Sequence, residues 1–157
     1  MLRWIDVIKY AKYSNPEPSR RVEKTEAEWQ RHLTPQQFEV LRRKGTEPPY
    51  RNAYCKSYDP GVYVCAGCGT PLFNSTEKYH AISGWPSFTQ PIAKGALKYL
   101  FDDSHHMQRI EAQCNTCDGH LGHVFPDGPA PHGLRFCINS ESMVRLAEPE
   151  QQDGENA

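Results

Sequence analysis

The sequence predicts a mainly β domain of the α+β class, with short helices confined to the N-terminal part of the chain. The chain of 157 residues contains 13 prolines, 11 glycines and 11% aromatic residues, which suits a turn-rich β domain better than a helical bundle. Beyond residue 54, short apolar runs alternate with turn signals, a pattern typical of antiparallel sheets. Two Cys-x-x-C pairs further indicate a metal ion that staples the domain.

Short helices are expected in the first third of the chain. Apolar residues recur at roughly helical spacing over residues 4–13, and the prolines within 15–19 end that segment. Two capping boxes, Thr25–Glu28 and Thr34–Gln37, each mark the start of a further helix. The second of these helices should end near Gly45.

Strands are expected wherever apolar and β-branched residues lie between turn signals. The segment 84–88 is instead predicted to be a rigid aromatic turn, because it combines glycine, proline and two aromatic residues. The predicted strands cover residues 61–65, 71–73, 98–101, 108–112, 120–125 and 134–139.

The chain divides into an N-terminal extension at residues 1–24, one domain at 25–147 and a flexible polar tail at 148–157. The net charge is −1 with mixed signs, so we expect no nucleic-acid partner. No apolar run approaches the roughly 20 residues of a membrane span, and the N-terminus lacks the features of a signal peptide. We therefore expect a cytoplasmic monomer without membrane association, in which cysteines serve as metal ligands or redox groups.

The paired cysteines Cys65/Cys68 and Cys114/Cys117 predict one structural zinc site. Each Cys-x-x-C turn offers two thiolates, and two such turns complete a tetrahedron of soft ligands. Such a site is closed to substrate. The alternative is two independent redox pairs or disulfides, although a thioredoxin-like pair would require a βαβ setting that the pattern lacks.

Cys137 stands apart from these pairs and is a candidate nucleophile. In an extended strand, Arg135, Cys137 and Asn139 point to one face, and a nearby guanidinium favours the reactive thiolate. His120 and His123 precede this strand and are candidate proton donors. The alternative is an inert core cysteine, a common role for a single cysteine in a strand.

Several motifs occur together and in one order: GWPSF at 84–88, HLGHVFPDGP at 120–129 and RFCINS at 135–140, with the two Cys-x-x-C pairs. This combination closely resembles the methionine-R-sulfoxide reductase family, type B, and the resemblance runs from about Thr34 to Met143. It implies two antiparallel β-sheets with short N-terminal helices and a structural zinc ion. It also implies reduction of the R epimer of methionine sulfoxide in proteins and peptides, with thioredoxin or another thiol as the reductant.

The resemblance also implies roles for individual residues. Cys137 would attack the sulfoxide sulfur and become a sulfenic acid. His120 and His123 would hold and protonate the sulfoxide oxygen, and Trp85 would form the apolar wall that receives the substrate methyl group. The two remaining candidates, Arg135 and Asn139, would orient the site and favour the thiolate.

One position departs from the family pattern. Many members carry a resolving cysteine immediately before the GWPSF motif, where this chain has Ser83. A serine cannot form a disulfide, so either an external thiol attacks the sulfenic acid or another cysteine does. Cys55 is the one cysteine without another role, and it is the candidate resolving residue.

Two other classes of function compete with this interpretation. A zinc-ribbon binding module would leave Cys137 inert and carry its function on a basic or apolar patch, but the chain has no concentrated basic stripe. A cysteine hydrolase would use Cys137 with His120 or His123 for acyl transfer, without any reductant.

Overall fold

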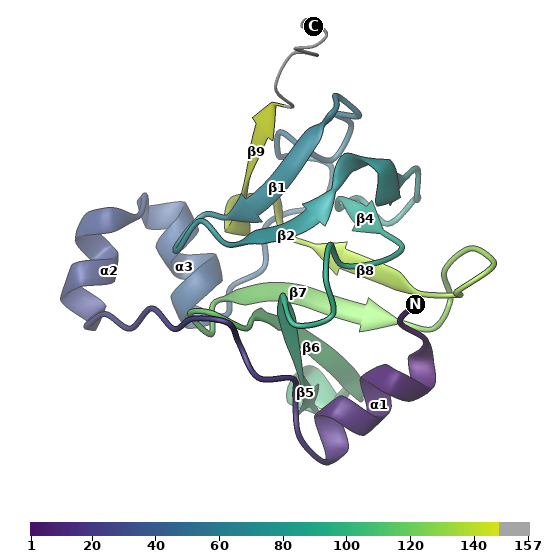
Figure 1. Cartoon of the computed structure of the whole chain (residues 1–157). Coiled ribbons are helices and arrows are strands. Elements are labelled where there is room, and N and C mark those ends of the chain that lie inside the picture. The colour runs from purple at the N-terminus through teal and green to yellow at the C-terminus, as the bar shows by residue number, and fades with distance from the viewer. Residues whose placement is uncertain (148–157) are drawn as a thin grey trace, which may run out of the picture.

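The computed structural model describes residues 1–147, and the predicted tail at 148–157 lies outside the described residues. Figure 1 shows two antiparallel sheets, with α2 and α3 at one end and α1 below. The smaller sheet has the strand order β2-β1-β9, and the larger has the order β3-β4-β8-β7-β6-β5. The predicted fold class is therefore confirmed.

All six predicted strands occur within two residues of their expected bounds. Three further strands, β3, β4 and β9, were not predicted, and β4 lies inside the expected aromatic turn. β3 and β4 are two residues long and exist through pairing with their neighbours, which local sequence does not reveal. The strands are β1 Gly61–Cys65, β2 Pro71–Asn74, β3 Lys78–Tyr79, β4 Ser87–Phe88, β5 Leu97–Asp102, β6 Arg109–Cys114, β7 His120–Phe125, β8 Arg135–Ile138 and β9 Met143–Ala147.

The helices are α1 Trp4–Lys12, α2 Glu26–His32 and α3 Pro35–Arg43. Both predicted capping boxes form. The Thr25 Oγ1 accepts from the Glu28 N–H at 3.2 Å, and the Glu28 carboxylate accepts from the Thr25 N–H at 2.8 Å. At the end of α3, Lys44 adopts the left-handed conformation (φ 59°), one residue before the expected glycine.

An aromatic cluster joins the two sheets. Phe73 of β2 stacks on Phe88 of β4 with ring centroids 4.3 Å apart, and Tyr63 of β1 meets Phe88 edge-on at 5.1 Å. Phe136 of β8 also packs against Phe73, at 5.6 Å, and all four rings are buried. Because strand residues alternate between faces, the larger sheet turns one face into this core and leaves its other face for polar side chains.

The N-terminal segment packs along β5, the outer strand of the larger sheet. The Asn15 side chain accepts from the Tyr99 N–H at 2.7 Å and donates to the Tyr99 carbonyl at 2.9 Å, so it satisfies both outer backbone groups of this residue. The Val22 N–H donates to the Thr116 carbonyl, and Arg21 pairs with Asp118. Residues 1–24 thus contact the domain along their length; their standing as a separate extension stays a prediction.

Four cysteines meet between the two sheets. The sulfur atoms of Cys65, Cys68, Cys114 and Cys117 lie within 4.8 Å of one another. The Cys65–Cys117 and Cys68–Cys114 sulfur distances are 3.7 and 3.6 Å. A tetrahedron with metal–sulfur bonds of ~2.3 Å has edges of about 3.8 Å, so this donor set fits a tetrahedral metal ion. Cys65 ends β1 and Cys114 ends β6, so the ion would join the smaller sheet to the larger.

We expect one metal ion per chain, bound by this cluster. Cys68→Ser should abolish stoichiometric metal binding and lower the melting temperature by roughly 10 °C or more, because several kcal/mol are lost at roughly 2–4 °C per kcal/mol. Elemental analysis and thermal unfolding measure both effects. Cys55→Ser is the matched control and should keep the metal. Equal metal content in the two variants would contradict this assignment.

Candidate active site

A row of side chains crosses four strands on the polar face of the larger sheet. Glu111 of β6 pairs with His123 of β7, His123 pairs with Cys137 of β8, and Cys137 pairs with Ser87 of β4. Directly opposite residues share a face and lie about 4.5–5.5 Å apart at their Cβ atoms. The thiol of Cys137 therefore lies beside the imidazole of His123.

A β-bulge brings His120 to the same face. Strand residues three apart normally point to opposite faces. In β7, however, Gly122 pairs with Ala112 and His120 pairs with Gln113, which leaves Leu121 as an extra residue. The two imidazole rings consequently lie 5.5 Å apart. The sequence alone does not reveal this bulge.

Hydrogen bonds from Asn139 stabilise the bulge. Its backbone N–H and its side-chain Nδ2 both donate to the Leu121 carbonyl, at 2.9 and 3.0 Å. Its Oδ1 accepts from the Glu47 N–H at 3.0 Å. Strand β8 ends at Ile138, one residue before Asn139, and the Asn139 side chain is buried. Asn139 therefore positions its neighbours.

Each histidine is backed by a carboxylate. His120 Nδ1 lies 2.7 Å from Glu111, and His123 Nε2 lies 2.7 Å from Asp102. Burial opposes ionisation of Asp102, but its hydrogen bonds with His123 and Ser104 hold its pKa well below its usual range. Because an ionised carboxylate only accepts hydrogen bonds, each of these ring nitrogens donates. His120 Nε2 and His123 Nδ1 remain for other partners.

The environments of His123 and Cys137 favour their uncharged forms. Burial lowers the pKa of His123, against the opposing effect of Asp102. Burial also raises the pKa of the Cys137 thiol, while the charge of Arg135 and a hydrogen bond from Ser83 act in the opposite direction. The expected influence of Arg135 is present, but burial outweighs it. Arg135 also shares its charge with Asp127, at 2.8 and 3.2 Å.

Trp85 lies in the loop beside Cys137. Its indole Nε1 donates to the Glu47 carbonyl at 3.0 Å, and the next residue, Pro86, accepts from the Ile138 N–H at 3.0 Å. These bonds fix the half-buried indole next to the end of β8. The indole therefore forms an apolar surface near the thiol.

Ser83 and Cys55 lie on two loops that contact each other. The Cys55 thiol donates to the Gly84 carbonyl at 3.2 Å, and the Tyr50 N–H donates to the same oxygen at 2.7 Å. Cys55 thus contacts the residue directly after Ser83, whose hydroxyl lies 3.4 Å from that of Ser87, the residue paired with Cys137.

Lys78 of β3 is a buried cation. Among the described residues, the Lys78 ammonium has no hydrogen-bond partner, and it lies 3.8 Å above the ring of Tyr58. Burial lowers the pKa of Lys78 to about 8, while a negative charge on Cys55 would raise it.

The site also includes carboxylates to which the sequence analysis assigned no role. One signal was present: Arg109, Glu111 and Gln113 alternate with apolar residues in β6, which places polar groups on one face. The pairing of these groups with the histidines is long-range, and local sequence does not predict it. The carboxylates are Glu47, Asp102, Glu111 and Asp127.

Comparison with known proteins identifies the family. Residues 33–146 match the family model described as the SelR domain. Peptide methionine sulfoxide reductase MsrB of Leptospira interrogans is 52% identical over 122 residues, which cover 78% of this chain and 93% of that protein. The MsrB proteins of Acinetobacter baylyi and Methanosarcina barkeri are 49% and 48% identical, over 86% and 87% of this chain and 96% of each relative. The chain therefore belongs to the SelR-domain family of MsrB peptide methionine sulfoxide reductases.

Proposed function

We propose that this chain reduces the R epimer of methionine sulfoxide in proteins and peptides, with Cys137 as the nucleophile. The observation that carries the proposal is the juxtaposition of the Cys137 thiol with two carboxylate-backed histidines on one face of a sheet. A thiol supplies the electrons, and the histidines bind and protonate the oxygen.

In the first half-reaction, the Cys137 thiolate attacks the sulfoxide sulfur. Methionine sulfoxide and the thiol become methionine and the Cys137 sulfenic acid. Two electrons pass to the substrate sulfur, and the oxygen ends on Cys137. Burial favours the protonated thiol before substrate binds, so the thiol has to lose its proton when substrate binds. Arg135 and Ser83 favour the thiolate that results.

The two histidines bind and protonate the sulfoxide oxygen. Their ring nitrogens without carboxylate partners, His120 Nε2 and His123 Nδ1, take up the proton that the Cys137 thiol loses and then donate it to the sulfoxide oxygen. The indole of Trp85 receives the substrate methyl group. A sulfoxide sulfur carries an oxygen, a methyl group, the rest of the side chain and a lone pair. With the oxygen at the histidines and the methyl group at Trp85, only one epimer can direct the rest of its side chain out to solvent. Asn139 keeps the two histidines on one face through Leu121.

Cys55 resolves the sulfenic acid in the second half-reaction. The Cys55 thiolate displaces the oxygen of the Cys137 sulfenic acid as water, a disulfide forms, and thioredoxin reduces it through its own dithiol. Two contacts support this role. The Cys55 thiol touches the carbonyl of Gly84, and the preceding residue, Ser83, contacts Ser87, which pairs with Cys137. The loop of Cys55 has to move towards Cys137 for the disulfide to form.

Zinc is the metal we propose for the cysteine cluster, because four thiolates at tetrahedral spacing suit zinc best. The ion would be structural. No helix among residues 1–147 is long and apolar enough to cross a bilayer. We further propose that the enzyme works as a monomer in the cytoplasm, where reduced thioredoxin is present.

The reaction and its nucleophile are tested together by turnover of a peptide containing methionine sulfoxide, as separated R and S epimers. We expect the R epimer to be reduced with dithiothreitol and with thioredoxin, and the S epimer to react roughly 100-fold more slowly or not at all. Cys137→Ser should abolish turnover, because serine cannot accept the oxygen reversibly.

Two other outcomes would contradict the proposed reaction. No turnover of either epimer by folded, metal-loaded protein would contradict the reductase and favour a binding module. Hydrolysis of an ester or peptide substrate without reductant would favour a cysteine hydrolase that uses the same thiol.

The thiolate can be followed by the pH dependence of Cys137 alkylation with iodoacetamide. Arg135→Gln removes a charge that lowers the thiol pKa, so the midpoint should move to higher pH and alkylation at pH 7 should slow several-fold. Peptide mass spectrometry measures alkylation at this residue. Arg31→Gln, an exposed arginine on α2, is the control and should leave the midpoint unchanged. The same midpoint in Arg135→Gln would mean that Asp127 already neutralises Arg135.

The resolving role of Cys55 is tested by mass spectrometry after a single turnover without reductant. The wild type should contain a Cys55–Cys137 disulfide, whereas Cys55→Ser should retain a sulfenic acid that dimedone traps on Cys137. Thioredoxin-supported turnover should then fall by about tenfold or more, because an intramolecular step is lost.

Ser83→Cys in the Cys55→Ser background is the matched rescue. It should restore both the disulfide and turnover, since Ser83 contacts Ser87, the residue paired with Cys137. A wild-type protein that keeps its sulfenic acid while Cys55 stays reduced would rule out this role.

A further inference from the structure

Two large apolar side chains are exposed on the loops beside Cys55. Tyr50 is 58% exposed and Ile82 is 87% exposed. The Tyr50 N–H and the Cys55 thiol both donate to the Gly84 carbonyl, at 2.7 and 3.2 Å. The Tyr50 hydroxyl donates to the Ile82 carbonyl, so the two residues adjoin. Together they form an apolar surface next to Cys55, which we call the loop patch.

The backbone holds the loop patch in a fixed position. Tyr50 adopts the left-handed conformation with φ 63°, which bulky residues rarely adopt. A Cβ on residue 84 would lie 2.6 Å from the Cβ of Pro49, so the two loops approach this closely only because residue 84 is glycine. Strained backbone is found most often at functional sites, and a fixed exposed aromatic ring binds a partner at a small cost in entropy.

The loop patch also borders the reacting thiol. Ser83 directly follows Ile82 in the chain. The Ser83 hydroxyl lies 3.4 Å from that of Ser87, which pairs with Cys137 in the larger sheet. A protein that covers the patch is therefore placed beside both cysteines of the proposed disulfide.

The charges of the two loops suit one constant partner. The segments 48–58 and 78–86 contain no aspartate or glutamate, whereas Arg51 and Lys56 are exposed beside Cys55. The three carboxylates at the ends of these segments are engaged: Glu47 is buried, Asp59 pairs with Arg145, and Glu77 accepts from Thr89. A positive rim favours a partner with an acidic rim. Oxidised substrates differ from one another in charge, so this pattern fits the reductant better than the substrates.

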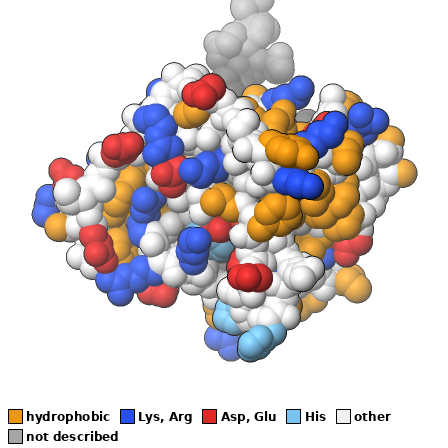
Figure 2. Space-filling view, turned by 90° about the horizontal axis from the view of Figure 1, so that it is seen from below, with side chains coloured by type: hydrophobic (Ala, Val, Ile, Leu, Met, Phe, Trp, Pro, Cys, Tyr) orange, Lys and Arg blue, Asp and Glu red, His pale blue; other side chains and the backbone are white. Residues whose placement is uncertain are grey.

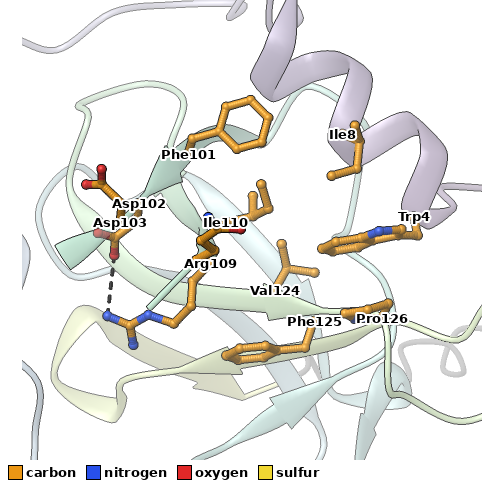
Figure 3. A pocket seen from close by; sticks show the side chains of 11 residues that line it. Trp4, Ile8, Phe101, Asp102, Asp103, Arg109, Ile110, Val124, Phe125 and Pro126 are labelled. Carbon is orange, nitrogen blue, oxygen red and sulfur yellow. Dashed lines mark ion pairs between the residues drawn. The ribbon is translucent and has the colours of Figure 1, made fainter. Parts of the chain in front are cut away.

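A larger apolar surface lies elsewhere on the molecule. Figure 2 shows hydrophobic side chains gathered on the face that looks downward in Figure 1, the side on which α1 lies. Figure 3 shows a cavity of about 670 Å³ on this side, with Trp4 of α1 and with Phe101 and Val124 of the strands. Strand pairing places Phe101 and Val124 on the core-facing side of the larger sheet, opposite Cys137. A reductant bound there would face away from the reacting thiol.

We propose that the loop patch is the docking surface of the reductant, a protein that carries a reactive dithiol beside an apolar surface. The proposal rests on the function proposed above. A thiolate of the reductant attacks the Cys55 sulfur of the Cys55–Cys137 disulfide, a mixed disulfide forms, and Cys137 leaves as a thiolate. The second thiol of the reductant then displaces Cys55. Both enzyme cysteines are thereby reduced by two electrons, and the reductant is oxidised to its disulfide.

Reductant kinetics with a small substrate test the docking surface. N-acetyl methionine-R-sulfoxide is the substrate, so that no substrate polypeptide covers the loops. Ile82→Ser and Tyr50→Asn should each raise the KM for thioredoxin by about tenfold. Asparagine is chosen because it tolerates the left-handed conformation. The rate with dithiothreitol should stay unchanged, because this small reductant needs no docking surface. Leu146→Ser is the matched control, since Leu146 is 53% exposed on β9.

An unchanged KM for thioredoxin in both variants, with normal dithiothreitol rates, would overturn the docking surface. Slower reduction of an oxidised protein with dithiothreitol, at unchanged KM for thioredoxin, would also overturn it and assign the patch to substrates.

If the wild type reduces no sulfoxide at all, the proposed function fails, and thiol exchange at Cys55 still tests the patch. Cys55 is then converted to its mixed disulfide with 2-nitro-5-thiobenzoate in the Cys137→Ser background. Release of the chromophore by thioredoxin should be about tenfold slower with Ile82→Ser or Tyr50→Asn, and release by dithiothreitol should be unchanged. Equal thioredoxin rates with and without these substitutions would overturn the docking surface.

Discussion

The extra residue at Leu121 is the constraint on which the geometry of the site depends. Without it, His120 and His123 would point to opposite faces of the sheet, and one of them would enter the aromatic core. The bulge removes the Leu121 carbonyl from the regular ladder, and Asn139 satisfies this carbonyl twice. Asn139, the residue that follows β8, therefore stabilises the register of β7. Thiol and imidazoles are aligned by the backbone pairing of two neighbouring strands.

The carboxylates around the site are paired with cations. Asp102 lies 3.5 Å from Arg109, Glu111 lies 3.3 Å from Lys44, and Asp127 binds Arg135. Burial can then keep Cys137 protonated in the absence of substrate, which protects the thiol from unproductive oxidation. The four-cysteine cluster is separate from this chemistry. It joins the ends of β1 and β6, and so fixes the smaller sheet against the strand that carries Glu111.

Local patterns predicted what depends on local physics. The capping boxes at Thr25 and Thr34 and the strand β1 appear where the sequence indicated. The two cysteine pairs could be assigned to one metal site from the sequence because metal ligands have few alternative partners. The bulge at Leu121 and the partnership of Asp102 with His123 could not be predicted. Both depend on which strands become neighbours, and a register shift of one residue would change every pair.

The outer edge of β5 has a consequence for the behaviour of the protein in a crowded cell. An uncovered edge strand presents unpaired N–H and C=O groups, a template for β-sheet aggregation. Here the side chain of Asn15 occupies the Tyr99 N–H and C=O, and α1 lies alongside the strand. The N-terminal segment therefore shields part of this edge from pairing with exposed strand-forming segments of other chains, and it does so without a covalent link.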